Sequence, residues 1–203
     1  MIATGERLTS EFFDRSAHDV ARDLLGATLR FEAVGGVIVE TESYVESDPA
    51  CHAHVGVTAR TSVLFDRPGI AYVYLSYGIH SLLNCVTEPE GEAGAVLIRA
   101  LRPVWGIDQM EHRRGGVSRA ALCSGPGKLT QALGIDLSHN SLALDRPPFE
   151  LHGRDPQTPE PPILSGPRIG ISKGVELPWR YCVAAEPDVS RPRPAGWREA
   201  CRA

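Results

Sequence analysis

Two carboxylates and a phenol alternate between residues 37 and 44, a run whose composition is typical of a β-strand. Alternate residues of a strand point to the same face. The residues that share a face here are Ile38, Glu40, Glu42 and Tyr44. One interpretation is a solvated edge of an antiparallel sheet, where polar side chains face water. The other is a carboxylate at the rim of a cleft, where the neighbouring carboxylate raises or shares its proton affinity. The spacing supports both equally.

A second group of reactive side chains, Cys51, His52 and His54, falls within the irregular segment 46–67. Cysteine and histidine bind zinc, but a zinc site needs three or four ligands, and no second cluster is spaced to complete this one. Long ordered loops are often functional, so the favoured interpretation is that His52 hydrogen-bonds a ligand.

Three of the five tyrosines, Tyr72, Tyr74 and Tyr77, fall within six positions. Such a cluster is most often part of a core, and Tyr72 fits that interpretation. Tyr74 shares its face on a predicted strand over 71–75, whereas Tyr77 precedes Gly78 at a turn, where a side chain protrudes. Aromatic rings both in a cleft and at a tip suit proteins that stack an extruded base and fill the gap that it leaves.

Arg99 lies near the end of a short apolar strand predicted over 95–100. An arginine that faces the core needs a carboxylate partner, and Glu42 is a candidate.

A glycine-rich turn over 123–128 leads into a predicted helix. Its backbone N–H groups, together with the helix N-terminus, are suited to cradle a phosphate. The turn lacks the Walker A spacing, which disfavours ATP binding.

The remaining pattern predicts the strands and helices that carry these residues. A helix is expected over 16–25, with Ser16 as its N-cap and Gly26 as its stop. Strands over 27–31 and 37–44 are expected to form a hairpin around Gly35-Gly36. Further strands are expected over 71–75, 81–86, 95–100, 168–172 and 179–184, and helices over 105–114 and 128–133. Frequent prolines predict extended chain and loops over 147–167.

This mixture predicts an α+β fold with a hairpin-rich mixed or antiparallel sheet and surrounding helices. We expect one domain over residues 1–203, with its core over about 12–184. The tail from about 187 carries Pro, Arg and Gly and is expected to be loosely ordered.

The composition is that of an ordinary globular protein, with 42% hydrophobic and 23% charged residues and a formal net charge of -4. This charge argues against a histone-like coat on DNA, but a local basic face is compatible with it. Five scattered cysteines, no signal-peptide pattern over 1–15 and no apolar stretch of bilayer length predict a reducing cytoplasm and no membrane. Only Lys128 and Lys173 are lysines, which leaves few amines for a Schiff base.

Six blocks of these residues occur in a fixed order. They are Glu40-Thr41-Glu42-Ser43-Tyr44, Asp48-Pro49-Ala50-Cys51-His52, Thr58-Ala59-Arg60, Tyr72-Val73-Tyr74 with Tyr77-Gly78 and Asn84, Leu97-Ile98-Arg99-Ala100-Leu101, and Cys123-Ser124-Gly125-Pro126 with Lys128-Leu129. Together they resemble the alkyladenine (3-methyladenine) DNA glycosylase family over about Phe12 to Ala184. The resemblance implies a base-excision-repair enzyme that flips alkylated or deaminated purines from duplex DNA and hydrolyses the N-glycosidic bond.

The resemblance also assigns the catalytic roles. It implies that Glu42 activates the attacking water and that Arg99 holds both this water and Glu42. The backbone carbonyl near Val183 is implied as a third ligand of the water. Glu40 is left with a structural or tuning role.

Substrate contacts follow from the same resemblance. It implies that Tyr44, His52 and Tyr74 form the base pocket, and that Asn84 lines it and discriminates against the amino group of guanine. The implied DNA contacts are Tyr77 as a wedge in the base stack, and Thr58, Arg60 and Lys128 on phosphates.

We therefore expect a monofunctional enzyme that leaves an abasic site, needs no cofactor or metal, and acts as a monomer associated with a bacterial nucleoid. Three alternatives remain: a non-catalytic lesion-recognition protein, a hydrolase of free nucleosides, and a metal-dependent hydrolase built on Cys51, His52 and His54.

Overall fold

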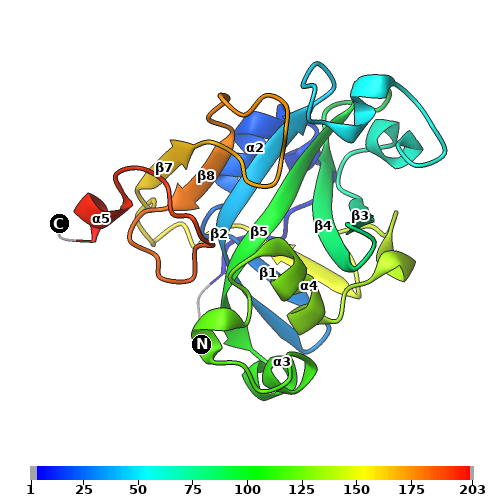
Figure 1. Ribbon diagram of the computed structural model, residues 1–203. Coiled ribbons are helices and arrows are strands. Elements are labelled where there is room, and N and C mark those ends of the chain that lie inside the picture. The colour runs from blue at the N-terminus through cyan, green and yellow to red at the C-terminus, as the bar shows by residue number, and fades with distance from the viewer. Residues whose placement is uncertain (1–3, 202–203) are drawn as a thin grey trace.

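The computed structural model describes residues 4–201, whose strands form one branched sheet with helices packed against it (Figure 1). The helices are α1 (Ser10–Phe13), α2 (Ala17–Asp23), α3 (Ile107–Arg113), α4 (Pro126–Leu133) and α5 (Trp197–Ala200), with 3-10 helices η1 (His52–Val55), η2 (Ser62–Phe65), η3 (Arg119–Ala121) and η4 (Leu137–His139). The strands are β1 (Thr28–Phe31), β2 (Val34–Val45), β3 (Ala71–Ser76), β4 (His80–Thr87), β5 (Gly94–Trp105), β6 (Phe149–His152), β7 (Ile163–Gly166) and β8 (Arg180–Val183). The predicted α+β class is confirmed.

The long strand β2 is the axis of the sheet, whose main order is β3-β4-β5-β2-β1-β6 with antiparallel neighbours. One edge of β2 pairs with β5, and the other edge pairs first with β1 and then with β8. Both edges are therefore occupied, and every residue from 34 to 43 is buried. The interpretation of Glu40 and Glu42 as a solvated sheet edge is wrong, because neither side chain has a path to water through a free edge.

A bulge interrupts the alternation of β2 at Glu40. The register with β5 shifts between Ile38 and Glu40, and again between Glu40 and Thr41. A bulge places an extra residue on one strand, so spacing by two no longer assigns side chains to faces. Ile38 accordingly belongs to the main core, whereas Val39 packs in a separate cluster with Val189.

The hairpin between β1 and β2 turns earlier than the sequence predicts. Phe31 pairs with Val34, so the turn is at residues 32–33, and Gly35 and Gly36 lie inside β2. A Cβ on Gly36 would come 2.3 Å from the carbonyl oxygen of Arg102. These glycines are thus required for close strand approach and not for the turn.

The strand predicted over 168–172 is also wrong, because this segment is a loop and β7 at Ile163–Gly166 pairs with β8 instead. The backbone N–H of Ile169 donates to Glu42, and the side chain of Arg168 pairs with Asp48. Gly170 then adopts φ +80°, which is outside the β region. Side-chain partners replace the strand partners of this segment.

Several local predictions are confirmed. Ser16 caps α2 by accepting a hydrogen bond from the His18 N–H, and α4 ends at Gly134 with φ +81°. The tail after Pro187 differs from the loose order expected, since Val189 and Ser190 are buried. No helix within residues 4–201 has the length and apolar character needed to cross a membrane.

Candidate active site

Arg99 on β5 lies between the two carboxylates that β2 carries. The Arg99 Nε–Glu40 Oε1 and Arg99 Nη1–Glu42 Oε2 distances are both 3.2 Å. The side chain of Arg99 is 6% exposed and those of both glutamates are 0% exposed. Taking each ion out of water costs several kcal/mol, and the attraction between the arginine and the two carboxylates offsets this cost. The expected pairing of Arg99 with Glu42 is present, and Glu40 is a second partner that the sequence did not predict.

Glu40 joins this pair to the C-terminal part of the chain. Its carboxylate accepts from Arg180 Nε at 2.6 Å, and from the backbone N–H and Oγ of Ser190 at 2.8 and 2.9 Å. Arg180 also donates to the Ser190 carbonyl at 3.2 Å. The four buried charges, two glutamates and two arginines, sum to zero.

Glu42 is fully buried and does not itself line the neighbouring cleft, but its three partners do. Oε1 accepts from the Ile169 N–H at 2.8 Å, and Oε2 accepts from the Tyr44 hydroxyl at 2.8 Å and forms an ion pair with Arg99. Burial raises the pKa of Glu42, and the charge of Glu40 raises it further. The charge of Arg99 and the two hydrogen bonds lower this pKa and so oppose the effect of burial. A carboxylate has about four acceptor positions, so Glu42 retains the capacity to accept from a water molecule.

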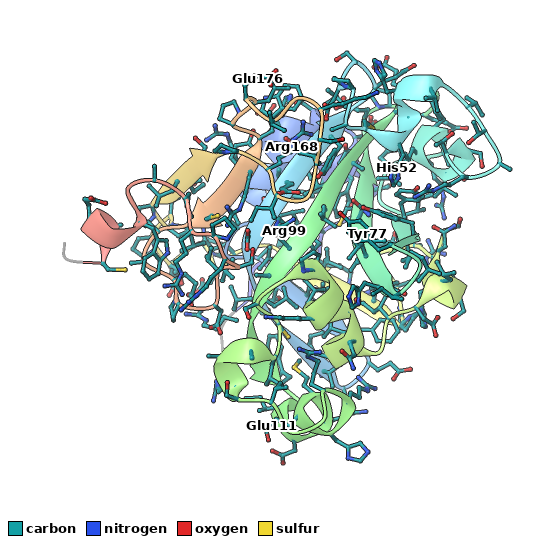
Figure 2. The ribbon with its side chains drawn as sticks, in the orientation of Figure 1. His52, Tyr77, Arg99, Glu111, Arg168 and Glu176 are labelled. Carbon is teal, nitrogen blue, oxygen red and sulfur yellow. The ribbon has the colours of Figure 1, made fainter. Side chains whose placement is uncertain are left out.

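The cleft has a volume of about 940 Å³, which is within the usual range of ligand sites, about 300–1,000 Å³. Figure 2 shows Arg99 at the centre of the sheet, with His52 and Tyr77 to one side of it. No aspartate or glutamate lines the cleft within the described part of the chain. Its cations are Arg60, Arg99, Arg114, Lys128 and Lys173.

One wall of the cleft is aromatic. The rings of Tyr72 and Tyr74 are stacked with centroids 5.4 Å apart, and the His52 ring meets Tyr74 edge-on at 4.6 Å. Arg60 lies 5.4 Å over the Tyr74 ring and donates to His52 Nε2 at 3.3 Å. His52 Nδ1 is 3.0 Å from the Tyr72 hydroxyl. Burial, and secondarily Arg60, lower the pKa of His52 to about 4, so this ring is neutral at neutral pH.

The opposite wall is held by a second buried ion pair. Arg168 pairs with Asp48 through the two terminal nitrogens of its guanidinium, and both side chains are 0% exposed. The guanidinium lies 4.6 Å over the Tyr44 ring and 5.0 Å over the Trp179 ring. Tyr44 is therefore clamped between this cation and Glu42. Neither Arg168 nor Ile169 was predicted as a site residue, because the segment was interpreted as a strand.

Asn84 and Tyr77 occupy contrasting positions along the same hairpin. Asn84 on β4 is 4% exposed, lines the cleft, and donates from Nδ2 to the Tyr72 carbonyl at 3.1 Å. Tyr77, at the turn between β3 and β4, is 85% exposed and adopts φ +50°. A bulky residue in the left-handed region costs about 1–3 kcal/mol and is typical of functional sites.

The structure thus gathers eight predicted site residues at this cleft: Tyr44, His52, Arg60, Tyr74, Tyr77, Asn84, Arg99 and Lys128. Glu42, Thr58 and Val183 are not among the lining residues. The Thr58 hydroxyl is hydrogen-bonded to Thr61. Val183 is three residues beyond Arg180, the partner of Glu42 in the sheet, and therefore about 10 Å along the strand.

The Cys51, His52 and His54 side chains do not converge. His54 Nδ1 lies 3.1 Å from the Glu46 carbonyl, whereas His52 points to Tyr72. Burial raises the pKa of the Cys51 thiol to about 11, which disfavours the thiolate that binds metal. In residues 4–201 no group of three or more His, Cys, Asp or Glu is arranged to hold a metal ion. The geometry gives the metal-dependent alternative no support.

A buried carboxylate beside stacked rings is an arrangement that suits a hydrolase acting on a flat base. The methylpurine-DNA glycosylase family matches residues 11–187, so the chain belongs to this family of DNA glycosylases, hydrolases of N-glycosyl bonds. The predicted resemblance is confirmed.

Bacterial relatives match the chain over most of its length. It is 57% identical over 188 residues, 93% of this chain and 92% of the relative, to a protein of Rhodopseudomonas palustris provisionally named a 3-methyladenine DNA glycosylase. Proteins with the same provisional name from Bradyrhizobium diazoefficiens and Rhizobium meliloti are 54% and 50% identical. These cover 94% and 91% of this chain, and 94% and 98% of the relatives.

Replacing Glu40 with Ala should lower the free energy of unfolding by about 3–5 kcal/mol, because two buried arginines lose a shared partner. Urea unfolding measures this, with Glu46→Ala as the control at an exposed position just beyond β2. The control should stay within about 0.5 kcal/mol of the wild type. Equal effects of the two substitutions would contradict the role of Glu40 as the junction.

Proposed function

We propose that this protein flips alkylated or deaminated purines out of duplex DNA and hydrolyses the N-glycosidic bond with water activated by Glu42. The observation that carries the proposal is that all three partners of the buried Glu42 carboxylate line the cleft. Burial raises the pKa of this carboxyl, while Arg99 holds it near enough to ionisation to accept a proton. Membership of a DNA glycosylase family supports the same reaction.

In the proposed reaction, Glu42 takes one proton from water while the water oxygen bonds to C1′ and the C1′–N bond breaks. The sugar has oxocarbenium character in the transition state, so a nearby carboxylate also stabilises its charge. An N-alkylated purine carries a positive charge and departs neutral, so it needs no proton from the protein. A deaminated purine is neutral, so its departure requires a proton from a general acid. Arg99 positions Glu42. The loop N–H of Ile169 supplies the third contact to this carboxylate, and the backbone carbonyl near Val183 is proposed as a ligand of the water.

The base pocket is proposed to be built from Tyr44, His52 and Tyr74. Tyrosine faces attract cationic rings by about 0.5–2 kcal/mol each, and a neutral His52 does not repel them. The amide of Asn84 is held by Tyr72, and we propose that it excludes bases that carry the exocyclic amino group of guanine.

DNA contacts are proposed for Tyr77 as the wedge, and for Thr58, Arg60 and Lys128. Tyr77 protrudes from a strained turn, which suits insertion into the space that a flipped base leaves. Arg60 and Lys128 line the cleft, whereas Thr58 is on the exposed loop beside it. A cleft with cations and no lining carboxylate gives DNA a local attractive field despite the net charge of -4.

We further propose a monofunctional enzyme. Both lysines of the chain, Lys128 and Lys173, line the cleft, so candidates for a Schiff base exist. Both are exposed, and a nucleophilic lysine is usually activated by desolvation. Borohydride should therefore trap no covalent complex between the protein and DNA.

Glu42→Gln should lower base release by about 10²–10⁴-fold, because it removes the proton acceptor, while lesion binding is retained. Duplexes with hypoxanthine, ethenoadenine or alkylated purines, cleaved by alkali after incubation, measure release, and fluorescence anisotropy measures binding. Glu46→Gln serves as the matched control. Turnover like that of the wild type in Glu42→Gln would refute the proposal.

Activity should fall on the acid side of the pH profile, as pH drops through the pKa of Glu42. This pKa lies above the ordinary glutamate value of about 4.3. The charge of Glu40 contributes to raising this pKa, so Glu40→Gln should move the acid limb to lower pH. Single-turnover rates against pH, taken where both proteins are folded, test this. A merely structural role of Glu40 would leave the limb in place.

Tyr77→Gly should lower excision from duplex DNA while excision from single-stranded DNA is retained, because only the duplex has a stack to fill. Glycine accepts φ +50° without strain, so unfolding should change by no more than about 1 kcal/mol. Parallel assays on duplex, single strand and mononucleoside distinguish the alternatives. Equal loss on both kinds of DNA would remove the wedge role, and preference for mononucleosides would favour a nucleoside hydrolase.

A further inference from the structure

A second cavity of about 380 Å³ lies next to the cleft and is separate from it. The two share Arg99, Lys128 and the turn at Gly125-Pro126, where α4 begins. The rest of its lining is residues 120 and 124 together with the C-terminal segment, Pro187, Val189, Ser190, Arg191 and Arg193. The cavity is therefore closed by a part of the chain that the base pocket does not use.

The charged residues that line this cavity, Arg99, Lys128, Arg191 and Arg193, are all cations. No aspartate or glutamate lines it among the described residues. Arg99 is neutralised by its two glutamates, but Lys128, Arg191 and Arg193 form no ion pair within the described chain. Three uncompensated cations at one hollow, in a protein of net charge -4, indicate an anionic ligand.

Hydrogen bonds to Glu40 fix the position of the C-terminal segment that carries Arg191 and Arg193. Ser190 is anchored to Glu40 through its N–H and Oγ, and Glu40 also binds Arg99. Arg191, the next residue, is exposed and thus emerges beside the active-site network. In Figure 1 the orange-to-red segment after β8 runs back toward β5 before it reaches α5.

Arg193 is preorganised in the same segment. Its guanidinium lies 3.7 Å over the Trp197 ring and donates to the Pro187 carbonyl at 2.7 Å. An arginine that is already positioned loses less conformational entropy when a ligand binds. A planar guanidinium also matches two oxygens of a phosphate.

We propose that Arg191 and Arg193 bind the DNA backbone, with one or two phosphodiesters of the strand that carries the flipped nucleotide in the second cavity. This inference rests on the proposed function. The strand leaves the base pocket past Lys128, which borders both hollows, and continues over the C-terminal segment. The segment thus acts as a clamp whose anchor is Glu40.

The test measures binding of an undamaged duplex over a range of salt concentrations, so that base excision plays no part. Each phosphate contact adds about 0.9 to the slope of log K against log salt. Arg191→Ala/Arg193→Ala should reduce the slope by about 2 and weaken binding by roughly tenfold at 0.15 M salt. Arg191→Lys/Arg193→Lys should keep the slope, because the slope depends on positive charge and lysine retains it. This variant lacks the planar guanidinium that stacks on Trp197.

The control is Arg67→Ala/Arg146→Ala, which removes two exposed arginines outside both cavities and should leave the slope unchanged. An unchanged slope in the Arg191/Arg193 alanine variant, or an equal fall in the control, would overturn the clamp. Thermal unfolding with inorganic phosphate is a further arm. Phosphate that stabilises the wild type but not the alanine variant, with equal DNA slopes, would assign the cavity to free phosphate. Failure of the wild type to bind any duplex would instead defeat the proposed function.

Discussion

The rest of the site depends on one buried guanidinium that is shared by two carboxylates. Arg99 satisfies Glu40 on one side and Glu42 on the other, inside a sheet in which β2 has no free edge. Without Arg180 this group would carry a net negative charge in the interior, where an unpaired ion costs several kcal/mol. The second arginine makes the cluster neutral, so the sheet can hold an ionised carboxylate next to a hydrophobic core.

The division of labour between the glutamates follows from their partners. Glu40 is saturated by groups that are themselves buried, so it is committed to structure. Glu42 is bonded only to groups that line the cleft, namely Tyr44, Arg99 and the Ile169 N–H. The pKa of Glu42 is therefore set by burial and by groups that also contact the cleft. The strand spacing that made the two residues look equivalent carries none of this information.

Local sequence signals predicted what local physics decides. The β3–β4 hairpin and the pairing of Arg99 with Glu42 follow from strand patterns and from the need of a buried arginine for a carboxylate. The turn predicted at Gly35-Gly36 is wrong because a glycine pair is typical of both turns and close strand contacts. Only the close approach of the Arg102 carbonyl shows that this pair serves strand contact. The contact of Ile169 with Glu42 spans 127 positions, and no pattern within either segment encodes it.

Charge distribution explains how an acidic chain suits an anionic ligand. Coulomb attraction at a binding face depends on charges within about 8–10 Å at physiological salt, since more distant exposed charges are screened. Both lysines of the sequence, Lys128 and Lys173, line the cleft. Among the described residues, no carboxylate lines the cleft or the second cavity. Glu40 and Glu42, which contact the lining residue Arg99, are paired with Arg99 and Arg180. The two arginines of the buried cluster thus offset the negative charges of Glu40 and Glu42, which would otherwise repel DNA.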